Sequence, residues 1–81
     1  MRELNKEEMQ KNQVNTIPQY YILDYLKQNL NIDEFKIYLV NRNNIKVVDT
    51  IGDYLYFSYD NNTREITYSK KAKEYVKDME L

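Results

Sequence analysis

The fold class is decided by one stretch of the sequence, Asp53-Tyr54-Leu55-Tyr56-Phe57-Ser58-Tyr59. Alternating aromatic and aliphatic residues favour a β-strand, in which successive side chains point to opposite faces of a sheet. Leu55 and Phe57 suit the face that packs on a core. Tyr54 and Tyr56 then point the other way, so the stretch predicts a half-buried strand whose second face carries tyrosines.

Alternation of the same kind continues on both sides of this stretch. It predicts four short strands, at residues 35–40, 45–49, 54–59 and 64–68. The segments between them are short and rich in Asn, Asp and Gly, which tolerate the backbone of tight turns. Because connections this short join antiparallel neighbours, the prediction is a four-stranded antiparallel meander.

The register of the meander decides which side chains share a face. Pairing Tyr59 with Arg64 is internally consistent, because it gathers one apolar set on a single face: Leu55, Phe57, Tyr59, Ile66 and Tyr68. Depending on the register of the first hairpin, the opposite face gains Tyr38 or Val48.

Two helices are predicted before the strands. Asn5 and Glu8 have the spacing of a capping box, but few apolar residues follow, so this helix should be weak and residues 1–14 could form a mobile arm. Thr16 and Gln19 form a second capping box, and a helix of about twelve residues should follow it. Its apolar residues fall at helical spacing on one face: Ile22, Leu23, Leu26 and Leu30, with Tyr21 and Tyr25 beside them.

A third helix is predicted at the end of the sequence. Ser69 is placed as its N-cap, and an apolar stripe follows at helical spacing: Ala72, Tyr75, Val76 and Met79. The complete prediction is one α+β domain over residues 1–81. It contains a weak N-terminal helix, an amphipathic helix, a four-stranded antiparallel meander and a C-terminal helix packed on the sheet.

Composition excludes most kinds of catalysis. The 81 residues include nine tyrosines but no histidine, cysteine or tryptophan. The commonest general base, the thiol nucleophile and the soft metal ligands are therefore missing. With Gly52 as its only glycine, the chain cannot build a phosphate-binding loop. Only chemistry based on carboxylates stays open, so we expect a protein that is not an enzyme and uses no metal or cofactor.

Charge and hydropathy restrict the partners. Twelve basic and thirteen acidic side chains give a net charge of −1, which supplies no overall field that would attract nucleic acid. The absence of cysteine is typical of a reducing compartment, and no stretch approaches the roughly 20 apolar residues of a membrane span. We therefore expect a cytoplasmic protein with neither signal peptide nor membrane anchor.

The predicted sheet face with Tyr54, Tyr56 and Tyr38 is the leading candidate site. Tyrosine combines a broad apolar ring with a polar tip and binds protein surfaces at low entropic cost. The hypothesis is a protein-binding module that inhibits or regulates a larger protein or ribonucleoprotein. An inhibitor of a host defence nuclease, encoded by a phage or another mobile element, is one version of it. The alternative interpretation is that a helix of the same chain covers this face.

Two further hypotheses use other features. A basic cluster near the end of the sequence could bind an anion or stack the bases of single-stranded nucleic acid: Arg64, Tyr68, Lys70, Lys71 and Lys73. The tyrosine face or an edge strand could instead pair with a second copy of the chain, which would make the protein a homodimer with a structural role.

Overall fold

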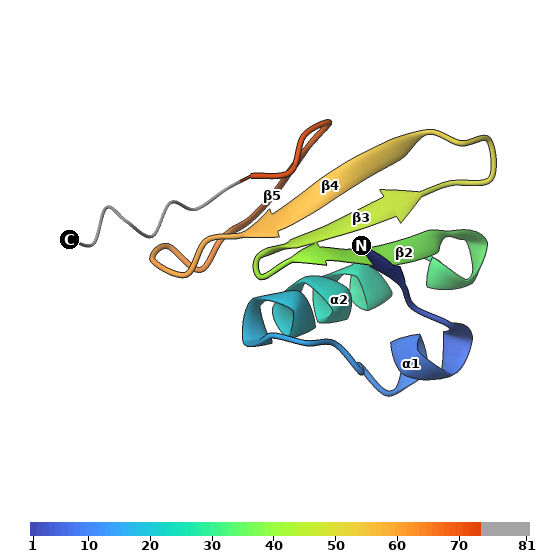
Figure 1. Ribbon diagram of the computed structural model, residues 1–81, viewed down its shortest axis with the longest axis horizontal. Coiled ribbons are helices and arrows are strands. Elements are labelled where there is room, and N and C mark those ends of the chain that lie inside the picture. Colours follow the sequence, from blue (N-terminus) through green and yellow to red (C-terminus); the bar gives the residue numbers. More distant parts are fainter. Residues whose placement is uncertain (74–81) are drawn as a thin grey trace.

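Residues 1–73 fold into two layers, a five-stranded antiparallel sheet and two α-helices that lie on one face of it (Figure 1). A computed structural model describes residues 1–73. The elements follow one another as β1 (Arg2–Glu3), α1 (Lys6–Gln10), α2 (Ile17–Asn29), the 3-10 turn η1 (Ile32–Glu34), β2 (Lys36–Asn41), β3 (Asn44–Val48), β4 (Tyr54–Tyr59) and β5 (Ile66–Ser69).

Helix α2 begins where the sequence predicts it. The N–H of Gln19 donates to Thr16 Oγ1 (3.2 Å), and Gln19 Oε1 accepts from the N–H of Thr16 (3.2 Å), which completes the capping box. Leu30 is its C-cap and has an extended backbone. The side chain of Asn31 then caps η1 by accepting from the N–H of Asp33.

The N-terminal segment also forms its predicted capping box. Asn5 Oδ1 accepts from the N–H of Glu8 (2.8 Å), and Glu8 Oε1 accepts from the N–H of Asn5 (2.9 Å). Leu4 and Met9 on either side of the cap are buried in the core. These two apolar contacts hold the short helix α1, which lacks the apolar stripe that would stabilise it alone.

The predicted meander is present, but the predicted number of four strands is wrong, because β1 adds a fifth strand. The sheet order β1-β2-β3-β4-β5 follows the sequence order, and all neighbours are antiparallel. Strand β1 pairs with the edge of β2, where the N–H of Leu4 also donates to the carbonyl of Ile37 (2.8 Å). Two residues carry no alternating pattern, so sequence periodicity could not indicate this strand.

The register between β4 and β5 is shifted by two residues from the predicted one. Tyr59 lies opposite Ile66 rather than Arg64. The turn is longer than expected because Arg64 adopts a left-handed backbone (φ 62°) and its N–H donates to the carbonyl of Asp60 (2.7 Å). Since side chains alternate with a period of two, the shift leaves the predicted faces unchanged.

The core lies between α2 and the sheet face that α2 covers. Ile22, Leu23 and Leu26 of the helix have no exposed surface. They pack with a buried apolar set from the sheet: Ile37, Leu39, Ile45, Val47, Phe57 and Tyr59. Burial of each such side chain contributes about 1.5–3 kcal/mol, so this layer is the main source of stability.

The C-terminal helix does not begin at the predicted N-cap. Ser69 is the last residue of β5, and residues 70–73 are not helical. Tyr75, Val76 and Met79 of the predicted stripe lie outside the described residues. A strand end and an N-cap both favour a small polar residue, so Ser69 alone could not distinguish the two.

An asparagine side chain holds the segment after β5 against the sheet. Asn44 has no exposed surface. Its Nδ2 donates to the carbonyl of Lys73 (2.6 Å), while its Oδ1 accepts from the N–H of Lys73 (3.0 Å) and from the hydroxyl of Ser58. The amide therefore binds the backbone of Lys73 much as a neighbouring strand would.

We predict that Asn44→Ala lowers the free energy of unfolding by about 2 kcal/mol, because it leaves buried polar groups without a partner. Urea denaturation followed by tyrosine fluorescence measures the change. The matched control is Asn61→Ala in the exposed turn after β4, which should change stability by less than about 0.5 kcal/mol. Equal effects of the two substitutions would contradict this account of Asn44.

Candidate functional site

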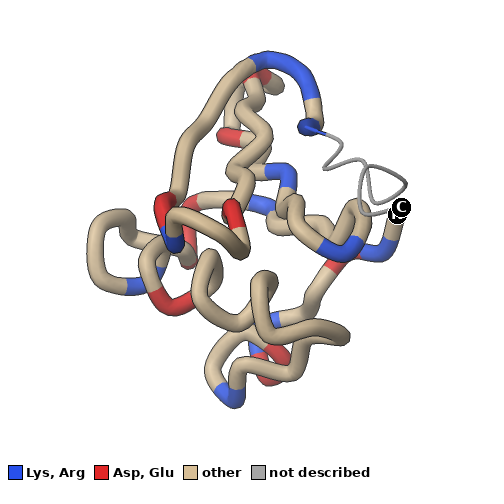
Figure 2. The backbone as a smooth tube through the Cα atoms, turned by 90° about the vertical axis from the view of Figure 1, so that its left-hand side faces the viewer, with Lys and Arg blue, Asp and Glu red and all other residues tan. Residues whose placement is uncertain are grey.

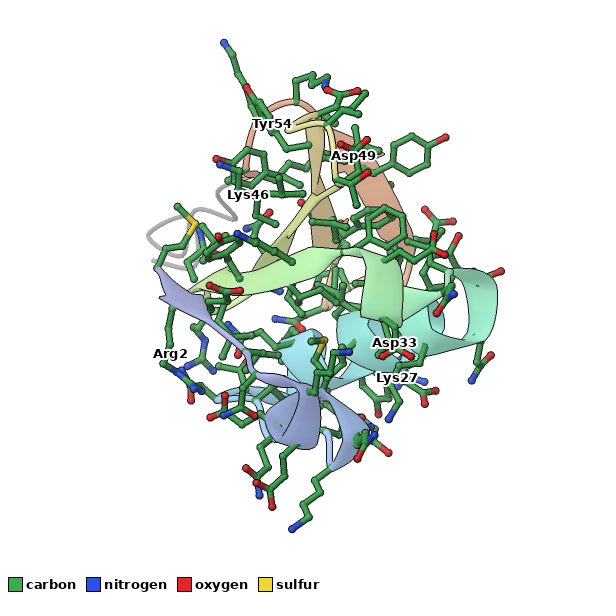
Figure 3. The ribbon with its side chains drawn as sticks, turned by 90° about the vertical axis from the view of Figure 1, so that its right-hand side faces the viewer. Arg2, Lys27, Asp33, Lys46, Asp49 and Tyr54 are labelled. Carbon is green, nitrogen blue, oxygen red and sulfur yellow. The ribbon has the colours of Figure 1, made fainter. Side chains whose placement is uncertain are left out.

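The three tyrosines of the predicted site lie together on one sheet face. In the observed register Tyr38 lies opposite Lys46, Lys46 opposite Tyr56, and Val48 opposite Tyr54. We call these five residues the outer face. Figure 3 shows Lys46 and Tyr54 on the side of the sheet away from α1 and α2.

Helices α1 and α2 leave the outer face uncovered. The side chain of Tyr54 is 37% exposed, and Tyr38 and Tyr56 are half-buried. At the end of this face away from Tyr54, the side chains of Asn44 and Ser58 are buried. The backbone of Lys73 lies against Asn44 there. The accessible part is thus the patch around Tyr54 and Tyr56.

Two lysines bind the rings of this patch. The Nζ atoms of Lys46 and Lys70 each lie 4.7 Å from the centre of the Tyr54 ring, and Lys46 Nζ lies 5.5 Å from that of Tyr56. The two rings meet edge to face at 5.8 Å. Cation–π contacts of this kind contribute about 0.5–1 kcal/mol each at exposed sites and restrict the ring orientations.

Asp53 completes the edge of the patch. Lys70 Nζ donates to Asp53 Oδ1 and to the carbonyl of Tyr54, the latter at 2.8 Å. The hydrogen bond from Lys70, the N–H of Tyr54 and the charge of Lys70 together hold the pKa of Asp53 below its ordinary value. Asp53 therefore stays ionised over the whole neutral range and keeps Lys70 beside the ring.

The alternative basic cluster is not assembled into one surface. Lys70 lies at the Tyr54 end of the outer face, whereas Tyr68 contacts Phe57 on the opposite face, with ring centres 5.5 Å apart. Arg64 also faces the side of α2, and Lys71 is exposed in the segment after β5. Figure 2 shows basic and acidic positions spread over the backbone rather than gathered on one side.

A second feature, which the sequence analysis did not find, is a groove between α2 and β5. Its volume is about 800 Å³. We call it the inner groove. Its walls combine one flank of α2, the turns after β2 and β4, and the start of β5: Ile17, Pro18, Tyr21, Asp24, Tyr25, Gln28, Arg42, Tyr59, Asn61, Arg64 and Ile66. The spacing of Tyr21 and Tyr25 beside the core stripe was the one available signal.

The aromatic rings of the inner groove are held by stacking. Tyr21 stacks on Tyr59 with ring centres 5.1 Å apart, and Tyr25 lies 6.4 Å from Phe57. Tyr21 and Tyr25 nevertheless remain 47% and 40% exposed. The groove therefore presents fixed ring surfaces, which suit binding rather than chemistry.

Residues 1–73 contain no group of three or more acidic side chains close enough to hold a metal ion. Within the same range, no helix has the length and apolar character needed to cross a bilayer. Comparisons with protein-family models, with curated proteins and with solved structures gave no significant match. Function is therefore inferred from the geometry of the two surfaces.

We predict that Lys70→Met raises the pKa of Asp53 towards its ordinary value, because the substitution removes the main hydrogen bond to the carboxylate. Carboxyl ¹³C chemical shifts followed through an acid titration report this pKa. Since the folded-state pKa is lowered, the stabilisation by this ion pair is complete above the unfolded pKa of about 4 and is lost on acidification.

The control is Lys71→Met, which removes an equal charge from a residue that forms no ion pair with Asp53. It should leave the titration of Asp53 almost unchanged. An equal shift in both variants would mean that general charge, and not the Lys70 contact, lowers the pKa.

Proposed function

We propose that this protein is a non-catalytic binding module that attaches to a larger protein through the outer face and inhibits or regulates it. The observation that supports this most is the position of Tyr54, exposed and bound by two lysine side chains. A side chain that is already ordered loses little entropy on binding, so its contacts contribute more fully to affinity.

The chemistry of the outer face also indicates the kind of partner. Tyrosine rings in the middle of a contact, with charged groups around them, are typical of the residues that dominate binding energy in protein interfaces. Lys36, Lys46 and Lys70 contribute three positive charges to this face and its edge, and Glu3 and Asp53 contribute two negative charges. The face therefore favours a partner surface that is mildly acidic and offers acceptors for tyrosine hydroxyls.

Inhibition by such a module needs no catalytic group. A small rigid domain that covers a functional surface of its target blocks access by volume alone. This fits a chain that lacks histidine and cysteine. A regulator that stabilises one conformation of its target would use the same contact, because a ligand shifts an equilibrium by its difference in affinity for the two states.

We predict that the Tyr54→Ala/Tyr56→Ala double variant loses at least about tenfold in affinity for the partner, since truncation of such residues costs 2 kcal/mol or more. Partners are isolated from lysate on immobilised protein, identified, and then titrated in purified form. The matched control is Tyr20→Ala, which removes an exposed ring from α2 on the other side of the molecule. Full affinity in the folded double variant would exclude the outer face.

The nucleic-acid and homodimer hypotheses predict different outcomes. Binding of single-stranded nucleic acid would give an anisotropy signal with labelled oligonucleotides that falls steeply with added salt. Under our proposal the titration stays flat at low ionic strength, and light scattering reports a monomer. A saturable, salt-dependent titration or a stable dimer would replace the proposal by the corresponding alternative.

A further inference from the structure

Strand β5 leaves one side of the sheet open among the residues that the structure describes. It is the last strand in the sheet order. The N–H of Asp60 donates to the carbonyl of Glu65, which fixes the alternation of hydrogen bonds along the pair. Thr67 and Ser69 consequently bond to β4, whereas Ile66 and Tyr68 direct their N–H and C=O groups away from the sheet.

The open edge lies beside the inner groove. Ile66 belongs both to the edge and to the groove wall, and Tyr68 is 63% exposed on the same face. A sixth strand added to this edge would place alternate side chains over the face that contains Ile66 and Tyr68. Those side chains would enter the space between β5 and the exposed rings of Tyr21 and Tyr25.

The groove carries an uncompensated positive charge at one end. Arg42 follows β2 and Arg64 precedes β5, and both line the groove near the first turn of α2. Neither arginine forms an ion pair within residues 1–73. Asp24 is the only acidic residue of the lining, and its carboxylate already accepts from Gln28. A carboxylate is the natural partner for two such guanidinium groups.

We propose that the β5 edge and the inner groove bind an extended segment of a partner protein, which adds to the sheet as a sixth strand. Its backbone bonds to Ile66 and Tyr68, one acidic side chain binds Arg42 and Arg64, and apolar or aromatic side chains lie on Tyr21 and Tyr25. The proposal goes beyond the outer-face contact, because it uses another surface and another mode of recognition.

The edge and the charges favour this occupant over two others. A nucleic acid lacks the alternating donors and acceptors that a strand edge requires. A second copy of the chain could pair β5 with β5 in antiparallel fashion. In the register that pairs Ile66 of one copy with Tyr68 of the other, however, Arg64 of each would lie opposite Lys70 of the other, and like charges in that position are destabilising.

A displayed library of random twelve-residue peptides tests the proposal on the complete chain. We expect selected peptides to be rich in β-branched residues with at least one Asp or Glu. Bound peptide should protect the amides of Ile66 and Tyr68 from hydrogen exchange, as followed by NMR. Methylation of alternate peptide nitrogens should abolish binding, because it removes the backbone donors.

Three variants locate the contact. Arg64→Gln should weaken the selected peptide about tenfold, through loss of a charge-assisted hydrogen bond. Tyr68→Pro removes one N–H that points outward and forms no bond to β4. Its control is Tyr68→Ala, which removes the ring and keeps the N–H donor. We expect the proline variant to bind at least about fivefold more weakly than the alanine variant.

The Tyr54→Ala/Tyr56→Ala variant should bind the peptide normally, which separates this proposal from the outer-face contact. The proposal is overturned if no peptide is selected, if the selected peptides protect other amides, or if proline and alanine at position 68 behave alike. Dimerisation that Tyr68→Pro abolishes would assign the edge to a second copy. Oligonucleotide binding that Arg64→Gln abolishes would assign the groove to nucleic acid.

Discussion

The contact of α2 with one face of the sheet is the constraint on which the rest of the structure depends. Ile22, Leu23 and Leu26 are fully buried against the inner side chains of β2, β3 and β4. Because strand side chains alternate, covering one face fixes which residues remain on the other. The exposed position of Tyr54 and the half-exposed position of Tyr56 are thus consequences of where a helix thirteen residues long can lie.

The same constraint leaves part of the inner face uncovered. The helix packs mainly on the middle of the sheet, so β5 extends beyond it, and Tyr68 stays largely exposed while Phe57 beside it is buried. Tyrosine suits this boundary because its ring can pack against the core while its hydroxyl reaches water. The molecule therefore has two tyrosine surfaces of different character: a flat face bound by lysines, and a groove with two arginines.

Sequence reasoning predicted what depends on local pattern. The capping box of Thr16 and Gln19 located α2, and the alternation around Leu55 and Phe57 located β4 and its two faces. The two-residue error at Arg64 left those faces intact, because only an odd shift exchanges them. These successes concern helix capping and periodicity, which a single segment carries by itself.

The missed features depend on contacts between distant segments. Strand β1 has too few residues to show an alternating pattern. It forms because Arg2 and Glu3 pair with the edge of β2. The inner groove takes Arg42 and Arg64 from two separate turns that are far apart in the sequence. The backbone of Lys73 is held by Asn44, a residue whose type gives no indication of such a partner. No local signal marks any of these contacts.

The order of the strands also has a consequence for how the chain acquires its structure during synthesis. From β2 onward each strand pairs with the one that follows it, so the hairpins close over short loops and can form rapidly. Helix α2, however, precedes every strand that covers it. Its apolar stripe stays exposed to the cellular environment until β4 has left the ribosome, and during that interval the nascent chain is most open to chaperones and to aggregation.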